Sequence, residues 1–235
     1  MDDDFDVLTL QPRPTAARPL LGLTVLVVED SRYSSEALRQ MCLRSGARIR
    51  RADCVASAQR HLNVYRPSAA IVDLGLPDGS GLDLIAAMHA ARPRVPILLG
   101  TSGAEREAAA AACTRAGANG FLPKPVASLA AFQSEVLRHL PEALRPSGPR
   151  DADVSAVSPD PLALREDFAH AMDLLALEAP PVGYLRRFLI GLARSAEDDP
   201  LERSALAMDG GFTGHDRLAL RAMLSQRIQA LPVPI

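Results

Sequence analysis

The stretch that decides the fold is Leu-Thr-Val-Leu-Val-Val-Glu-Asp, residues 23–30. It is a nearly unbroken apolar run of strand length that ends in two carboxylates, which is typical of a β-strand buried on both faces of a parallel sheet. Residues 69–73 and 95–100 repeat the pattern, and 47–51 and 118–122 repeat it in shorter form. The sequence therefore predicts five buried strands.

Segments with helical spacing of apolar residues separate these strands, and each has the length that a crossover between parallel strands requires. A strict alternation of strands and helices favours an α/β fold, here a (βα)5 doubly wound, flavodoxin-like parallel sheet. The predicted helices are 32–45, 56–65, 82–91, 104–116 and 128–140.

The pattern changes after this α/β part. Residues 142–160 form a proline-rich linker, and residues 161–235 show helical spacing without strands, which predicts a small all-α domain of three or four helices. Residues 1–21 are an acidic N-terminal extension. Residues 22–141 carry a net charge of +4 and residues 150–235 a net charge of −4. The two charges indicate two domains and permit a closed arrangement in which the second docks on the first.

Composition excludes several classes of protein. No apolar run approaches the roughly 18 to 20 residues of a membrane-spanning helix, and the acidic N-terminus differs from a secretory signal, so we expect a cytoplasmic protein without membrane contacts. A net charge of −2 opposes nucleic-acid binding. Three cysteines without metal-site spacing are expected to be reduced.

Polar residues follow the predicted strands where the strands end. Glu29 and Asp30 close the first strand, Asp73 closes the third, Thr101 follows the fourth and Lys124 follows the fifth. Ligands of such sheets bind beyond the carboxyl ends of the strands. Clustered carboxylates without a nearby His or Cys favour a divalent cation that prefers oxygen ligands, Mg²⁺. Beside such a cation, one carboxylate can accept a phosphoryl group and form an aspartyl phosphate.

Lys124 is the only lysine among 26 basic residues. A chain that otherwise uses arginine has an ammonium at this one position, where a compact point charge can reach both a carboxylate and a phosphate. We therefore expect Lys124 to bind phosphoryl oxygens together with Thr101.

Residues 22–141 resemble the receiver domain of bacterial two-component response regulators. The resemblance rests on Val-Val-Glu-Asp at 27–30, Ile-Val-Asp-Leu-Gly-Leu-Pro-Asp-Gly-Ser-Gly at 71–81, the segment 96–101, and Gly-Ala-Asn-Gly-Phe-Leu-Pro-Lys-Pro at 117–125. These motifs cover about half the chain and include every position at which the family carries out its chemistry.

The resemblance implies that Asp73 is phosphorylated by a sensor histidine kinase or histidine phosphotransfer protein. The implied Mg²⁺ ligands are the side chains of Glu29, Asp30 and Asp73 and the main-chain carbonyl of Gly75. The resemblance also implies that Thr101 and Phe121 form the switch pair, that Lys124 pairs with the phosphoryl group, and that the Lys124–Pro125 peptide is often cis.

Two positions depart from the usual pattern of the family. Gly75 offers no side chain near the phosphoryl group, which leaves the lifetime of the phosphate open. The turn at residues 100–103 is richer in glycine than usual, which favours a mobile switch loop.

The sequence leaves the role of residues 161–235 open. We expect an adaptor, in which phosphorylation changes contacts with a protein target or a second copy of the chain. In that case the only chemistry is that of the phosphoacceptor and its autodephosphorylation. The alternatives are a segment with its own phosphotransfer or catalytic activity, with His170 or His215 as phosphoacceptor, and a DNA-binding transcriptional regulator. Arg186 and Arg187, a single basic pair, are interpreted as a solvated helix face.

Overall fold

A computed structural model describes residues 14–142, 145–146, 159–210 and 212–232. Its centre is a five-stranded parallel sheet with the order β2-β1-β3-β4-β5, which confirms the doubly wound α/β prediction. The order reverses direction between β1 and β3, so the loops after these two strands open a crevice at the carboxyl edge. The strands are β1 (Thr24–Val28), β2 (Arg48–Ala52), β3 (Ala69–Asp73), β4 (Ile97–Ser102) and β5 (Gly120–Pro123).

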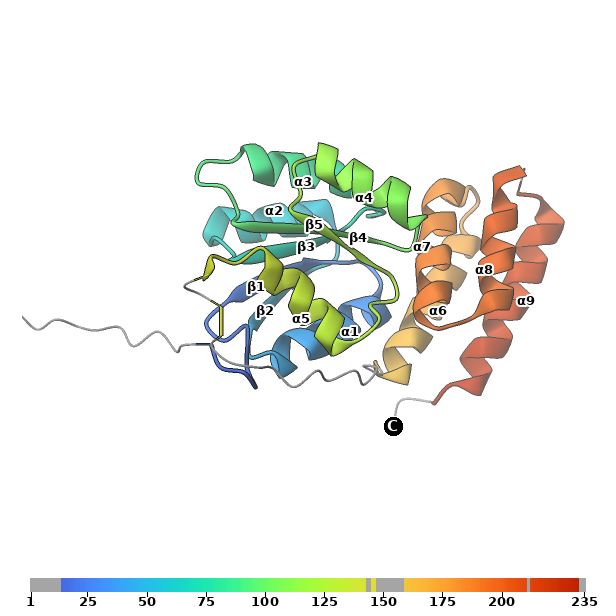
Figure 1. The fold of residues 1–235 in the computed structure, drawn as a ribbon. Coiled ribbons are helices and arrows are strands. Elements are labelled where there is room, and N and C mark those ends of the chain that lie inside the picture. Colours follow the sequence, from blue (N-terminus) through green and yellow to red (C-terminus); the bar gives the residue numbers. More distant parts are fainter. Residues whose placement is uncertain (1–13, 143–144, 147–158, 211, 233–235) are drawn as a thin grey trace, which may run out of the picture.

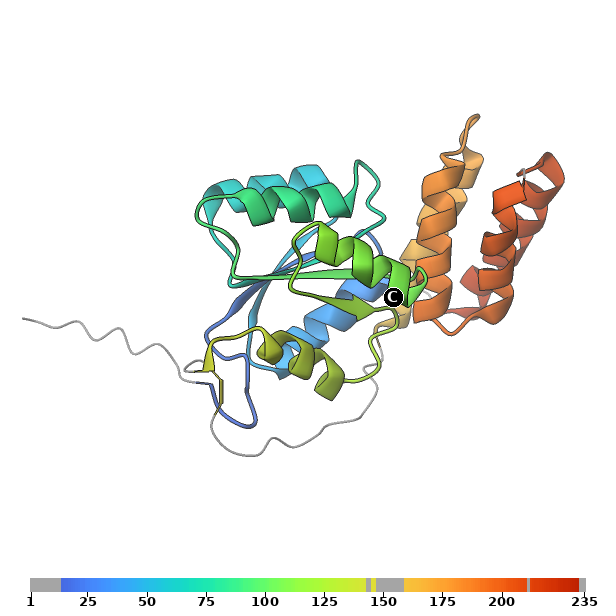
Figure 2. The same cartoon turned by 45° about the horizontal axis from the view of Figure 1, so that its top comes forward.

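Helices cover both faces of the sheet, as Figures 1 and 2 show. α1 (Arg32–Arg44) and α5 (Leu129–Arg138) cover one face, and their apolar side chains form one core with the sheet. α2 (Val55–Val64), α3 (Gly81–Ala90) and α4 (Arg106–Arg115) cover the other face and form a second core. Burial on both sides explains why β1 and β3 consist almost entirely of apolar residues.

Local sequence signals set the ends of these helices. Ser31, Ser80 and Ser128 each accept a hydrogen bond from a backbone N–H of the first turn of α1, α3 and α5. Gly46 and Gly117 follow α1 and α4 with positive φ angles of 85° and 94°, the conformation that ends many helices. The three serines lie at the carboxyl edge of the sheet, where each helix follows its strand, and the two glycines lie at the opposite edge, where each helix leads into the next strand.

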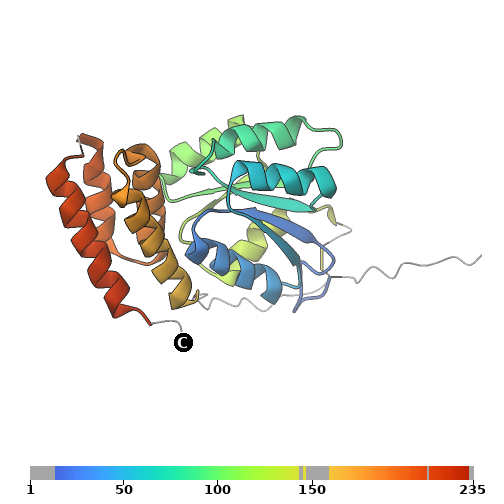
Figure 3. The same cartoon turned by 180° about the vertical axis from the view of Figure 1, so that it is seen from behind.

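The C-terminal part of the described chain is helical, as predicted. It consists of α6 (Pro161–Ala176), α7 (Val182–Ser195), α8 (Asp199–Leu206), a 3₁₀ helix η2 (Ala207–Gly210) and α9 (Gly214–Ala230). These elements, called the C-terminal helices below, share a third apolar core. They lie at the carboxyl edge of the sheet, where α6 and α7 pack against α1 (Figure 3). Tyr33 of α1 packs against their core.

The packed α/β part begins before residue 22. Leu20 is fully buried in the core below α1, and its N–H donates to the carbonyl of Ser45 at 2.9 Å. The rest of the predicted acidic extension, residues 1–13, and most of the predicted linker lie outside the described residues. Within the described residues, no helix is both long and apolar enough to cross a membrane.

Candidate functional site

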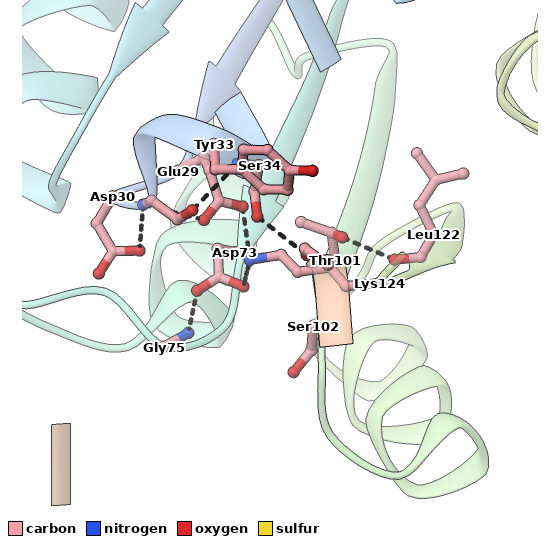
Figure 4. Close-up of polar contacts among 12 residues, drawn as sticks. Glu29, Asp30, Tyr33, Ser34, Asp73, Gly75, Thr101, Ser102, Leu122 and Lys124 are labelled. Carbon is pink, nitrogen blue, oxygen red and sulfur yellow. Dashed lines mark hydrogen bonds and ion pairs between the residues drawn. The ribbon is translucent and has the colours of Figure 1, made fainter. Parts of the chain in front are cut away.

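Three carboxylates meet at the carboxyl edge of the sheet. Glu29 and Asp30 follow β1 and Asp73 ends β3, and each offers an oxygen within 4.8 Å of those of the other two (Figure 4). Glu29 and Asp73 are buried, with 3% and 7% of their surface exposed. The three positions are close because β1 and β3 are neighbours in the sheet, on either side of its reversal.

Lys124 supplies the positive charge inside this cluster. Its Nζ lies 2.6 Å from Oε2 of Glu29 and 2.9 Å from Oδ1 of Asp73. The lysine follows β5, and the peptide bond between Lys124 and Pro125 is cis. The structure thus brings together Glu29, Asp30, Asp73 and Lys124, the charged residues that the sequence analysis selected.

Burial and mutual proximity shift the pKa values of the cluster. Burial raises the pKa of Glu29 well above its usual range, and the nearby charges of Asp73 and Asp30 raise it further, although Lys124 opposes them. Burial, followed by the charge of Asp73, raises the pKa of Asp30 to about 6. Burial lowers the pKa of Lys124, but Asp73 and Glu29 outweigh this effect, so that its net pKa is raised and the ammonium is held in its charged form.

These shifts predict a pH dependence of stability in the absence of divalent cations. With a pKa of about 6, Asp30 takes up a proton in the folded chain at pH values where the unfolded chain, with an ordinary carboxyl pKa near 3.8, stays ionised. Stability is therefore lost as the pH rises through 6 and gained as it falls. We expect the free energy of unfolding to increase by about 1 to 2 kcal/mol between pH 7.5 and 5.0.

Urea denaturation in a chelating buffer at a series of pH values measures this dependence. Asp30→Asn removes one of the titrating carboxyls and should reduce the slope of the profile between pH 7.5 and 5.0. A profile that keeps its slope in Asp30→Asn would show that Asp30 does not titrate in this range.

Thr101 ends the buried part of β4, beside the cluster. Its hydroxyl is buried and donates a hydrogen bond to the main-chain carbonyl of Leu122 at 2.7 Å. Phe121, the other member of the expected switch pair, precedes that carbonyl in β5 and is partly buried against α4 and the sheet. The Thr101 hydroxyl must leave Leu122 before it can bind any group attached to Asp73.

Gly75 follows Asp73 in the loop after β3. Its N–H donates to Oδ2 of Asp73 at 2.9 Å, while Oδ1 faces Lys124. The two oxygens of Asp73 are thereby oriented by two different partners, a backbone amide and an ammonium. These two contacts fix the orientation of the Asp73 carboxylate.

The C-terminal helices reach directly into this site. The hydroxyl of Tyr184, on α7, donates to Oδ2 of Asp30 at 2.7 Å. Arg194, near the end of α7, donates to the carbonyl of Gly103 in the loop after β4. In that loop the backbones approach so closely that a Cβ on Gly103 would lie 2.8 Å from the Cα of Gly191, so the glycine-rich turn admits α7. Contact with α7 therefore accounts for glycine at residue 103.

Asp167 of α6 anchors the same helices to α1. Its carboxylate accepts hydrogen bonds from the Ser31 hydroxyl at 2.7 Å, the Arg32 N–H at 2.8 Å and the Tyr33 N–H at 3.0 Å. Asp167 is 2% exposed, and burial raises its pKa. A negative charge at the start of α1 also matches the helix dipole. Since α1 begins directly after Glu29 and Asp30, this contact ties α6 to the metal-ligand candidates.

The docked arrangement that the opposite charges of the two halves permitted is present, and its exposed ion pair contributes little to it. One ion pair across the contact, Arg32 with Glu166 at 3.0 Å, has side chains 65% and 55% exposed, and exposed pairs contribute about 0 to 1 kcal/mol. Hydrogen bonds to Asp167 and Asp30 and the packing of Tyr33 hold the contact instead. These partners gave no sequence signal, because Asp167 and Tyr184 occupy ordinary helical positions.

The basic pair, Arg186 and Arg187, is more than the solvated helix face that the sequence analysis expects. Arg187 is exposed, but both arginines line a cavity of about 340 Å³ between α7 and the carboxyl edge of the sheet. Asp73, Gly75 and Lys124 line the same cavity. The basic pair therefore faces the candidate site.

The donor set suits a hard divalent cation. Mg²⁺ prefers carboxylate, carbonyl and water oxygens, and Glu29, Asp30 and Asp73 offer three carboxylates within reach of one ion. Burial, together with the neighbouring carboxylates, raises the pKa values of Glu29 and Asp30, so the ionised cluster is held under unfavourable conditions. A bound cation would relieve this excess.

Comparison with known proteins identifies the class to which this site belongs. Residues 25–134 match the family model of the response regulator receiver domain. Residues 25–134 are therefore a response regulator receiver domain. Receiver domains generally bind Mg²⁺ at an acidic pocket and are phosphorylated by histidine kinases, and Glu29, Asp30 and Asp73 form an acidic cluster here.

Individual relatives resemble part of the chain. It is 38% identical over 80 residues to the virulence transcriptional regulatory protein PhoP of Salmonella typhimurium strain 14028s, covering 34% of this chain and 36% of PhoP. It is 34% identical over 103 residues to the transcriptional regulatory protein PhoP of Escherichia coli O157:H7, covering 44% and 46%. The chain thus spans less than half the length of these curated relatives. The chemotaxis response regulator CheY4 of Vibrio cholerae is similar in structure, with 20% identity, a TM-score of 0.46, and coverage of 50% of this chain and 98% of CheY4.

Proposed function

We propose that this protein is a response regulator that accepts a phosphoryl group on Asp73 and transmits the change to its C-terminal helices. The observation that carries the proposal is a direct contact. The Tyr184 hydroxyl on α7 bonds to Asp30, whose carboxylate belongs to the same cluster as Asp73. A change of charge on Asp73 therefore acts on groups that already touch α7.

The phosphoryl donor is a sensor histidine kinase or a histidine phosphotransfer protein. An oxygen of Asp73 attacks the phosphorus of the donor phosphohistidine, the P–N bond breaks, and the imidazole leaves with its electron pair. The Gly75 N–H and the Lys124 ammonium orient the carboxylate for this attack. Lys124 also stays beside the new group and offsets its charge of about −1.5 to −2.

Glu29, Asp30, Asp73 and the main-chain carbonyl of Gly75 are the proposed ligands of Mg²⁺. When bound, this cation supplies positive charge to the phosphoryl oxygens during transfer. Ser31 supports the ligand set, because its N–H donates to Oδ1 of Asp30 at 3.0 Å.

Thr101 and Phe121 are the proposed switch. A phosphoryl group on Asp73 offers the Thr101 hydroxyl a charged acceptor, and such hydrogen bonds are stronger than the one now made to the Leu122 carbonyl. Movement of the hydroxyl frees space beside β5 for the partly buried ring of Phe121 to turn inward.

The output is proposed to be a protein contact. The C-terminal helices carry a net negative charge, which favours a protein target or a second copy of the chain over DNA as partner. PhoP of Salmonella typhimurium is named a virulence transcriptional regulatory protein, and transcriptional regulation is the alternative output that this name supports.

Incubation with a small acyl phosphate donor and Mg²⁺, followed by intact-mass spectrometry, tests the phosphoacceptor. The wild-type chain should gain one phosphoryl group, and Asp73→Asn should gain none, because the amide oxygen is too weak a nucleophile. Asp78→Asn, which removes an exposed carboxylate bonded to the first turn of α2, serves as the matched control and should react like wild type. Phosphate uptake by Asp73→Asn would contradict the proposal.

A second candidate function is phosphotransfer within the chain, through His170. This histidine lies on α6, is exposed, and lines a cavity of about 700 Å³ together with Asp30 and Tyr184. His215 lies exposed at the start of α9, and it does not line that cavity. An acid-labile, base-stable phosphate that disappears in His170→Gln would favour this function, whereas unchanged relay activity in His170→Gln would favour the adaptor.

A further inference from the structure

We propose that Arg187 of α7 binds the phosphoryl group on Asp73, so that phosphorylation tightens the contact between α7 and the receiver domain. The inference rests on the proposed phosphorylation of Asp73 and assigns an additional phosphoryl-binding residue from outside the receiver domain. Gly75, two residues after Asp73, provides the space that makes the contact possible.

The space above Gly75 lies between the carboxylate and the guanidinium. A Cβ on Gly75 would stand 3.4 Å from Oδ2 of Asp73 and 3.6 Å from both Cβ and Nε of Arg187. The Arg187 guanidinium nitrogen and the carboxylate oxygen are therefore no more than about 7 Å apart. A phosphoryl group attached to Asp73 extends into this interval, and a side chain at residue 75 would fill it.

The surroundings fit a dianionic group. The cavity of about 340 Å³ is lined by Asp73, Lys124 and Arg187, and also by the carboxylates of Glu29 and Asp30, whose charge a divalent cation would offset. It has room for a phosphoryl group together with water. Lys124 is already paired with Glu29 and Asp73. Within the described residues Arg187 forms no ion pair, and its side chain is exposed, so that its charge is available and its position adjustable. Guanidinium groups bind phosphate oxygens through two parallel N–H donors.

The direction of the switch follows from the position of Arg187. The residue lies one helical turn from Tyr184, which bonds to Asp30, and one turn from Gly191, which packs against the loop after β4. Pairing of Arg187 with the phosphoryl group adds a bond across a contact that already exists. Phosphorylation should therefore hold α7 against the receiver domain and should not release it.

Calorimetric titration of the full chain with beryllofluoride in the presence of Mg²⁺ tests the contact. Wild type and Arg203→Gln, a control that removes an exposed arginine of α8, should bind with equal affinity. Arg187→Gln should bind about tenfold more weakly, the usual size of one charge-assisted hydrogen bond at a partly exposed site, and Arg187→Lys should recover part of the loss. Equal affinity of Arg187→Gln and wild type would overturn the inference while leaving the phosphoacceptor intact. Absence of binding to wild type, or equal binding to Asp73→Asn, would instead contradict the proposed function.

Hydrogen exchange of the Arg32 and Tyr33 amides, which bond to Asp167, tests the direction. Beryllofluoride should slow their exchange in wild type and leave it unchanged in Arg187→Gln, while both chains should exchange at the same rate without it. Faster exchange in wild type on addition of beryllofluoride would mean release of the C-terminal helices and would overturn the proposed tightening.

Discussion

Replacing Lys124 with methionine is expected to lower the free energy of unfolding by about 3 to 5 kcal/mol at pH 7.5 in a chelating buffer. Methionine keeps most of the length of the side chain and removes its charge. The ammonium lies 2.6 Å from Glu29 and 2.9 Å from Asp73, and its side chain is only 8% exposed. Its removal leaves two buried carboxylates facing each other without a counter-charge, which is the costly way to break a buried ion pair.

Urea denaturation with and without Mg²⁺ measures this effect. Mg²⁺ should recover much of the loss, because a cation bound by the same carboxylates supplies the missing charge. Arg138→Met is a matched control, since it breaks a pair with Glu135 in which the arginine is 63% exposed, and it should cost less than about 1 kcal/mol. A loss below 1 kcal/mol in Lys124→Met would show that the carboxylates do not depend on the ammonium.

Replacing Asp167 with alanine is expected to undock the C-terminal helices and to lower the free energy of unfolding by about 2 to 4 kcal/mol. The substitution removes the acceptor of three hydrogen bonds, two of them from backbone N–H groups at the start of α1. A buried donor without a partner costs about 1 to 3 kcal/mol. The favourable interaction of the carboxylate with the α1 dipole is lost as well.

Hydrogen exchange and small-angle scattering check this expectation together. In Asp167→Ala the Arg32 and Tyr33 amides should exchange faster, and the molecule should become more extended. Glu166→Gln alters the neighbouring exposed ion pair with Arg32 and should leave both measurements unchanged. A compact Asp167→Ala chain with protected amides would show that apolar packing alone holds the contact.

The α/β part and its cluster of charged residues could be predicted from the sequence because their signals are local. Residues 23–28 and 69–73 are apolar because both faces of the sheet are covered, and Glu29, Asp30 and Asp73 are polar at the points where those runs stop. Because parallel strands have their carboxyl ends at the same edge of the sheet, residues that follow these strands are placed together at that edge.

The contribution of the C-terminal helices could not be predicted in the same way. Asp167 and Tyr184 contact residues 134 to 154 positions away, and nothing in their neighbourhood distinguishes them from other polar residues on a helix. Arg187 was interpreted as a solvated residue, and it is exposed. Its proximity to Asp73 depends on how α7 packs, and that packing is set by the shape of the whole apolar core of the C-terminal helices.

The hydrogen bonds from the start of α1 to Asp167 also have a consequence for biosynthesis. Asp167 is added to the growing chain 135 residues after Arg32, when all five strands have already been made. Because domains fold as units while synthesis continues, the nascent receiver domain forms with the first amides of α1 open to water. During this interval the Asp30 carboxylate is reachable by cations, and Tyr184 joins it only later. The order of translation therefore leaves the carboxylate cluster open to solvent before α6 and α7 pack against it.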